Sequence, residues 1–475
     1  MRPLVLIHGY SASGVDFAPL RDKLCDKLQR KPVDINIANY VSLNNEVTIK
    51  DIAEGLDRAF RHNKLLEGDA TEFDAIVHST GMLVIRAWLT NYGAQPGINK
   101  RVLRLKHLIG LAPATWGSPQ AHKGRTWLGA LVKGNRKFGP DFLNAGNLVL
   151  DNLELGSSFT WNLAHADLLG PEPYYDTGTN TPFVAVFIGN TAYKGLAAVA
   201  NDPGTDGTVR WAGCALNTRK IRLNLTRNPV NEKGETVPDE KRIQISDWAD
   251  KRLDIPMIAV NDRNHGTLVS DPEDEMVGFI KDFLNIGEPG AETYKDWINR
   301  AKAYSDRSIA SMKTGAAAEG WQQFVVRCID EHGDGISDYI IEVSTVGGGE
   351  KFTRFEEMYE DVHAYGADRS FRCFHIRLSP NLTDPKTPLW IRLHASTGTD
   401  LVVYQGYLKS GTAKQLTADS SPVELDLGQF SKLNGTIFYP FTTTLVEIVL
   451  NREPSPLNGI SKLLTWWKDP APGAS

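Results

Sequence analysis

Short apolar runs and helical patterns alternate along the first 285 residues of the chain. The apolar runs predict buried strands, which we expect at 4–7, 35–40, 75–77, 102–111, 181–189 and 255–260. Helical spacing of apolar residues, or a longer apolar stretch, predicts helices at 17–28, 49–62, 82–89 and 276–284. Strands that alternate with helices over this length predict a mostly parallel sheet with helices on both faces.

The pattern changes after Trp321. Short runs rich in β-branched and aromatic residues, separated by turn residues, predict an all-β, sandwich-like domain. We therefore expect an α/β domain, a linker that contains one helix, a β-sandwich-like domain and a tail, at 1–286, 287–320, 321–453 and 454–475. The runs at 221–225 and 242–245 are expected to pair as a hairpin inside the first domain, which should fold without the second.

Composition limits the classes of protein that fit this pattern. The chain has 475 residues, which is too many for one ordinary core. Hydrophobic residues make up 41% of the chain and charged residues 23%, proportions that are typical of a soluble globular protein. A formal net charge of −5 argues against a general nucleic-acid binder, and no apolar run is long enough to predict a transmembrane segment. The first strand begins by residue 4, which leaves no room for a signal peptide. A cytoplasmic protein and a secreted one whose leader has been removed both remain open.

The sequence predicts neither a metal nor a cofactor. No P-loop or Rossmann glycine pattern follows a predicted strand, so nucleotide chemistry is not indicated. Asp330, Asp334 and Asp338 lack the spacing of an EF-hand loop and are expected to be solvated acids. The widely spaced cysteines form no C-x-x-C pair. Cys328 and Cys373 are expected to be free buried thiols, with a disulfide between them as the alternative.

The segment 73–85 carries the strongest chemical signal. Its apolar run ends at His78-Ser79-Thr80-Gly81, and a mostly apolar helix is expected to follow directly. A serine on a sharp strand-to-helix turn is a nucleophile elbow, which lifts the hydroxyl above the sheet beside a helix N-terminus. We therefore expect Ser79 to be a nucleophile, and His78 to be a packed neighbour rather than its base.

Four motifs resemble those of the α/β-hydrolase superfamily, most closely its lipase-like branch. In chain order they are Leu4-Val5-Leu6-Ile7-His8-Gly9-Tyr10, His78-Ser79-Thr80-Gly81, Thr205-Asp206-Gly207-Thr208-Val209 and Asn264-His265-Gly266. The order serine, aspartate, histidine is that of the family, and the likeness covers roughly residues 1–285. It implies an α/β-hydrolase fold and the hydrolysis of carboxylic esters.

The resemblance also implies a role for each of these residues. His265 would take the proton of Ser79 and return it to the leaving group. Asp206 would orient His265, with Asp202 of the same loop as the competing candidate. The backbone N–H groups of Tyr10 and Thr80 would form the oxyanion hole.

The segment 115–181 interrupts the alternation of strands and helices. It is too apolar for a solvated loop and too long for a plain connection, so we expect a helical cap or lid over the site. Extra structural helices on the sheet remain the alternative. The aromatic residues expected to bind substrate are Trp116, Trp127, Phe159 and Trp161.

These expectations favour a serine esterase or lipase acting on esters with an apolar acyl group. Water-insoluble lipids and polyesters fit an aromatic cap, and a lipid or polymer surface is then the expected partner. A phospholipase or acyltransferase would use the same triad. A lipid-binding or adhesion protein with a vestigial triad is the alternative from another class, and the β-domain is its support. The sequence leaves the acyl chain length and the oligomeric state open.

Overall fold

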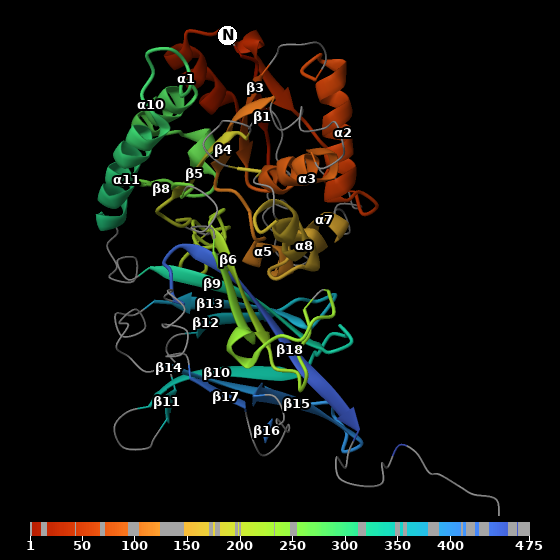
Figure 1. The fold of residues 1–475 in the computed structure, drawn as a ribbon. Helices are drawn as coiled ribbons and strands as arrows, with labels where there is room; N and C mark the ends of the chain where they lie inside the picture. The colour runs from red at the N-terminus through yellow and green to blue at the C-terminus, as the bar shows by residue number, and fades with distance from the viewer. Residues whose placement is uncertain are drawn as a thin grey trace, which may run out of the picture.

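The structure is a computed structural model of the chain. It describes residues 2–10, 17–42, 44–66, 72–93, 104–123, 147–170, 174–175, 181–194, 198, 201–231, 233–247, 254–311, 320–346, 352–354, 359–378, 389–409, 412–414, 423–426, 437–454 and 463. Figure 1 shows two bodies. The α/β body, at the top, is formed mainly by described residues up to 311, and the β-body, below it, is formed mainly by described residues from 320 onward.

A six-stranded parallel sheet forms the centre of the α/β body. In spatial order its strands are β2 (Ile35–Ala38), β1 (Leu4–Ile7), β3 (Phe73–His78), β4 (Leu105–Leu111), β5 (Phe183–Gly189) and β8 (Met257–Val260). Because successive residues of a strand point to opposite faces, a continuous apolar run places apolar side chains on both faces of the sheet. Leu4 and Leu6 belong to one core cluster, whereas Val5 and Ile7 belong to the other.

Helices cover both faces of this sheet, as the alternating pattern predicts (Figure 1). One face is covered by α1 (Ala18–Leu28), α10 (Asp274–Phe283) and α11 (Tyr294–Ala310). The other is covered by α2 (Ile49–His62) and α3 (Gly81–Gly93). Thr48 and Asp51 cap α2 reciprocally, which fixes where that helix begins. The prediction of an α/β-hydrolase fold is confirmed.

Helix α11 belongs to this body, although the sequence places it in a linker. The Trp297 side chain is fully buried, and its indole N–H donates to the Phe279 carbonyl at 3.1 Å. The Ser305 hydroxyl accepts a hydrogen bond from the Ala259 N–H of β8 at 2.9 Å. Helical spacing predicts the helix but not the surface it covers, and this one closes the core over β8 and β5.

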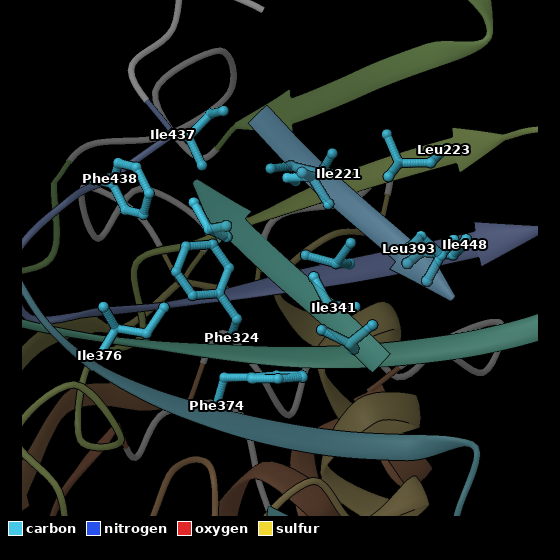
Figure 2. A pocket seen from close by; sticks show the side chains of 14 residues that line it. Ile221, Leu223, Phe324, Ile341, Phe374, Ile376, Leu393, Ile437, Phe438 and Ile448 are labelled. Atoms are coloured by element: carbon cyan, nitrogen blue, oxygen red, sulfur yellow. The ribbon is translucent and has the colours of Figure 1, made fainter. Parts of the chain in front are cut away.

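The β-body contains two facing sheets, which confirms the sandwich-like prediction. One has the order β11 (Phe352–Arg354), β10 (Tyr339–Val346), β14 (Leu389–Ala395), β17 (Val423–Asp426). The other has the order β12 (Tyr359–Ala364), β13 (Phe371–Arg377), β9 (Trp321–Asp330), β18 (Thr442–Pro454), β15 (Val402–Lys409), β16 (Thr412–Lys414). Apolar side chains from both sheets line a cavity of about 70 Å³ between them (Figure 2).

The hairpin of β6 (Thr218–Asn224) and β7 (Ile243–Asp247) joins the β-body. The two strands pair antiparallel, as predicted, but β6 also pairs in parallel with β18 from the far end of the chain. The expected division of the chain at residue 286 therefore does not follow the packing. An isolated hairpin is marginal in water, and the sheet beside β18 provides the partner that stabilises it. Strand periodicity does not indicate which sheet a strand will join.

The shorter helices α5 (Pro119–Lys123), α7 (Asn147–Leu153) and α8 (Ser158–Asp167) lie where the two bodies meet (Figure 1). The Trp161 ring packs against Phe371 of β13 with centroids 5.5 Å apart. Glu154 accepts hydrogen bonds from the His363 ring and from the Gly366 N–H, both at 2.8 Å. The described part of the expected cap is thus held between two bodies rather than lying free over the sheet.

Three further observations concern cysteines, metals and membranes. Cys25, Cys214, Cys328 and Cys373 are buried free thiols, so Cys328 and Cys373 do not pair. Across the described ranges, no group of His, Cys, Asp and Glu side chains has an arrangement that could hold a metal ion. In the same part of the chain, no helix combines the length and apolar character needed to span a membrane.

Candidate active site

Ser79 lies at the turn between β3 and α3. Its φ of 54° is in the left-handed region, which costs a non-glycine residue on the order of 1–3 kcal/mol. Glycines allow the close approaches on either side of this turn. A Cβ on Gly81 would lie 2.8 Å from the Ile7 carbonyl oxygen, and a Cβ on Gly9 would lie 2.8 Å from the Cβ of Ser79. The backbone therefore has the form of a nucleophile elbow, with the loop after β1 directly against it.

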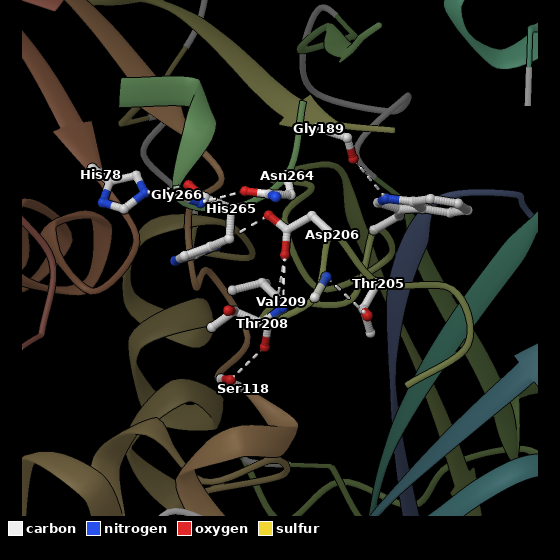
Figure 3. A network of polar contacts seen from close by, with 12 residues as sticks. His78, Ser118, Gly189, Thr205, Asp206, Thr208, Val209, Asn264, His265 and Gly266 are labelled. Carbon is white, nitrogen blue, oxygen red and sulfur yellow. Dashed lines mark hydrogen bonds and ion pairs between the residues drawn. The ribbon is translucent and has the colours of Figure 1, made fainter. Parts of the chain in front are cut away.

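His265 and Asp206 form a buried hydrogen-bonded pair (Figure 3). The His265 Nδ1–H donates to Asp206 Oδ2 at 3.0 Å. The second carboxylate oxygen accepts the backbone N–H groups of Thr208 and Val209 at 3.0 and 2.8 Å. With three donors and no solvent exposure, the carboxylate is fixed in orientation. Of the two candidate acids, Asp206 is the one whose side chain contacts His265.

One pocket brings together the predicted nucleophile, the predicted base and the two predicted oxyanion-hole residues. It has a volume of about 180 Å³, and Ser79, Thr80, Tyr10 and His265 all line it. Asp206 lies behind His265, away from the pocket wall. The other lining residues are Gly9, His78, Ser118, Gln120, Ala121, Leu150, Leu153, Tyr193, Gly207 and Thr208. Burial raises the pKa of the Tyr10 phenol to about 12, which keeps that hydroxyl protonated near neutral pH.

His78 does more than fill space beside the elbow. Its Nε2–H donates to the main-chain carbonyl of His265 at 3.0 Å, and the two rings lie 4.7 Å apart (Figure 3). Burial, followed by the nearby His265, lowers the pKa of His78 to about 3. The ring is therefore neutral near pH 7, and its one N–H is used by the His265 carbonyl.

Among the described residues, the Thr80 hydroxyl has no hydrogen-bond partner, although Thr80 is only 1% exposed. Thr80 immediately follows Ser79 and lines the pocket. A buried hydroxyl without a partner costs on the order of 1–3 kcal/mol, and a polar group of a bound molecule would remove that cost. The sequence assigns a role only to the backbone N–H of Thr80.

The aromatic residues expected to bind substrate do not line this pocket in the described part of the chain. Trp116 is fully buried and donates from its indole N–H to the Ala215 carbonyl at 2.8 Å. Trp161 packs on Phe371, and Phe159 is half-buried against the core. Trp127 lies outside the described residues. The large aromatic side chains serve here as packing, which is their commoner use.

The expected cap segment still contributes to the pocket through smaller residues. Leu150 and Leu153 of α7 and Ala121 of α5 form an apolar part of its wall. Ser118, the residue before α5, donates from its hydroxyl to the Thr208 carbonyl at 2.6 Å and so connects the start of α5 to the loop that carries Asp206. The leucines belong to the apolar pattern that marks this segment in the sequence. No local signal distinguishes them from the buried tryptophans beside them.

Comparison with solved structures finds a similar structure over nearly the whole chain. The phospholipase PlaB from Legionella pneumophila superposes with a TM-score of 0.73 at 21% sequence identity, covering 98% of each chain. Its complex with thio-NAD gives the same TM-score and coverage at 20% identity. No protein-family model matches the chain, and no curated protein matches its sequence. At this level of identity the likeness concerns architecture, and the chain has an α/β-hydrolase fold joined to a C-terminal mixed β-sheet region.

Proposed function

We propose that this protein is a serine carboxylic ester hydrolase that acts through an acyl-Ser79 intermediate. The observation that carries the proposal is the convergence of a left-handed Ser79 and a carboxylate-bound His265 on one pocket. A hydroxyl near a histidine is common on protein surfaces. A strained serine at a strand–helix turn, with a histidine oriented by a buried aspartate, is the arrangement that serine hydrolases share.

The chemistry runs in two halves. His265 Nε2 accepts the Ser79 proton as Oγ attacks the ester carbonyl carbon, and a tetrahedral oxyanion forms. When this intermediate collapses, His265 donates the proton to the alcohol oxygen, which leaves, and the acyl group stays on Ser79. Water then attacks the acyl-enzyme with His265 as the base. Release of the acid regenerates Ser79, while Asp206 stays ionised and holds the Nδ1–H.

The oxyanion is assigned to the backbone N–H groups of Tyr10 and Thr80. Both residues line the pocket beside Ser79, and Gly9 allows the loop after β1 to touch the nucleophile. Thr80 also stands at the beginning of α3, where the helix dipole favours negative charge. Donors fixed before the reaction stabilise the charge without reorganisation, and such electrostatic stabilisation is usually the largest single contribution to catalysis.

Esters with an apolar acyl chain are the proposed substrates, and phospholipids are the first class to test. Leu150, Leu153 and Ala121 offer an acyl chain an apolar wall. The full-length relative is a phospholipase, and the likeness includes the β-body as well as the α/β body. Neutral lipids and polyesters are the other members of this class.

A substrate panel tests the proposal. Purified full-length protein is assayed on p-nitrophenyl esters from acetate to palmitate, and by fatty-acid release from phosphatidylcholine vesicles, with Ser79→Ala as control. We expect turnover that Ser79→Ala abolishes, since loss of a triad nucleophile costs on the order of a millionfold in kcat. If the folded wild-type protein cleaves none of these esters, the triad is vestigial and a lipid-binding role replaces the enzymatic one.

A further inference from the structure

The loop that carries Asp206 is a compact hairpin whose base lies against the β-body. The Asp206 N–H donates to the Val209 carbonyl at 3.1 Å, and the Trp211 N–H donates to the Gly204 carbonyl at 3.0 Å. Thr205 and Arg210 form an antiparallel bridge between these bonds. A displacement of Gly204 or Arg210 is therefore carried to Asp206 at the tip.

Two rings of the β-body support one side of this base. Trp321 of β9 and His375 of β13 stack with centroids 4.8 Å apart and planes 11° apart. The Gly204 backbone packs closely against both rings. A Cβ at this position would be 2.6 Å from a Trp321 ring carbon and 2.8 Å from His375 Nε2. The φ of Gly204, 69°, also favours glycine.

His375 makes a directed bond to the same loop. Its Nε2 lies 3.1 Å from the Pro203 carbonyl oxygen, so the ring donates its N–H there. Burial, with the nearby Arg210 guanidinium, lowers the pKa of His375 well below its ordinary value. A neutral imidazole has one N–H, and its donation to the Pro203 carbonyl fixes the tautomer of His375. The same hydrogen bond fixes the distance between the loop and the sheet of the β-body.

The other side of the base is held through Arg210 and Ala212. The buried Arg210 guanidinium donates to Gln323 of β9 at 3.4 Å and to the Asp361 carboxylate of β12. Thr443 of β18 donates from its hydroxyl to the Ala212 carbonyl at 2.9 Å. Strands β9, β12, β13 and β18 thus all contact the loop that places the catalytic acid.

We propose that contacts from the β-body are required to hold Asp206 in the active site, and that His375 is a positioning residue for Asp206. Ser79 and His265 belong to the α/β body, whereas the loop that brings Asp206 to His265 is held by hydrogen bonds and ring contacts from the β-body. The inference rests on the proposed ester hydrolysis. It adds that the triad forms only when the two bodies are docked.

The experiment compares three variants of the full-length chain. His375→Leu removes the donor to Pro203, and His375→Gln restores an N–H at a similar position. His394→Leu is the matched control, because His394 lies on β14 in the opposite sheet, with its Nε2 3.9 Å from a Glu342 carboxylate oxygen. For each protein we measure kcat and KM on p-nitrophenyl butyrate, together with the thermal midpoint.

We expect His375→Leu to lose about tenfold to hundredfold in kcat, the cost of a small misplacement of a catalytic group, while KM changes little. His375→Gln should recover most of that loss, and His394→Leu should match the wild type. Folded His375→Leu with wild-type kcat would overturn the inference, as would an equal loss in the leucine and glutamine variants.

Gly204→Ala gives a second route if His375→Leu does not fold. The added methyl group would meet Trp321 and lift the loop without removing any hydrogen-bonding side chain. A similar fall in kcat at unchanged KM supports the inference, and wild-type kcat contradicts it. Failure of the proposed function looks different, because the wild-type protein would then cleave no ester at all.

Discussion

The backbone at Ser79 is strained, and its neighbours make the strain tolerable. The Ser79 N–H donates to the Leu111 carbonyl at 3.1 Å, and its carbonyl accepts the Ala114 N–H at 3.0 Å. These bonds to the end of β4 hold a conformation that an isolated chain would leave. The sequence predicts the elbow because its signals are local, namely a buried strand, a serine and a nearby glycine. It does not predict the bonds from β4 that support it.

The choice between Asp206 and Asp202 depends on contact rather than on pattern. Both aspartates precede a turn in the same loop, and only the fold shows which carboxylate meets His265. We expect Asp206→Asn to lower kcat by on the order of ten-thousandfold, because the amide favours the wrong tautomer of the imidazole. Asp202→Asn, assayed in parallel on a soluble ester, should stay within a few-fold of wild type. A larger loss at Asp202 would reverse the assignment.

His78 should make stability depend on pH in a definite direction. Its pKa is lowered to about 3 in the folded protein, against about 6.5 in an unfolded chain. Below pH 6.5 the unfolded chain therefore binds more protons. The stabilisation is complete above pH 6.5 and is lost as the pH falls toward 3.

Urea unfolding at several pH values between 7 and 4 measures this effect. We expect the free energy of unfolding to fall with pH more steeply in the wild type than in His78→Gln. His332→Gln, a change at an exposed loop residue, serves as the control. Equal slopes in the wild type and His78→Gln would show that His78 is protonated as easily in the folded state as in the unfolded chain.

Strands and helices are predicted better than their partners. The hairpin of β6 and β7 follows from period and turn residues, but its pairing with β18 joins Thr218 to Thr443 across 225 positions. Nothing near Thr218 in the sequence indicates that partner. The amphipathic α11 is likewise predicted as a helix. Its spacing does not indicate that the apolar face packs on the sheet of the α/β body, which only the folded structure shows. Local patterns determine elements, whereas long-range packing determines which body they join.

A chain that ends at Leu284 should therefore fail to fold. It would lack α11, which buries Trp297 against the α/β core, and it would lack β18, the neighbour of β6. We expect insoluble protein or an exposed core detected by dye binding, and no ester turnover. A chain that ends at Ser311 retains α11 and isolates the loss of the β-body. Soluble, active protein from either truncation would show that the α/β body is self-sufficient, as the sequence pattern suggests.

The proposed active site draws on both bodies. Length and pattern predict two cores, and two bodies are present, but their chain segments cross between them at β6, β7 and the Asp206 loop. The expected cap is also shared, since α7 contributes both to the pocket wall and, through Glu154 just beyond it, to contacts with the β-body. Sequence order does not reveal this sharing because the segments involved are far apart in the chain.

Acyl selectivity should respond to the wall supplied by α7. Replacing Leu153 by tryptophan would fill part of a pocket of about 180 Å³. We expect Leu153→Trp to lower kcat/KM on p-nitrophenyl palmitate far more than on acetate, because the short acyl group needs little of the pocket. The ratio of the two rates is the measurement, and it cancels any loss of folded protein. An unchanged ratio would place the acyl chain elsewhere.

Covalent labelling by a fluorophosphonate tests the central claim most directly, because it reports an activated serine without assuming a substrate. The wild-type protein and His265→Gln are treated with the same probe, and the adduct is located by peptide mass spectrometry. The account predicts about one adduct per chain, on Ser79, formed at least a thousandfold more slowly in the variant because its base is gone. A folded wild-type protein that remains unlabelled, or that carries the adduct on another serine, would contradict it.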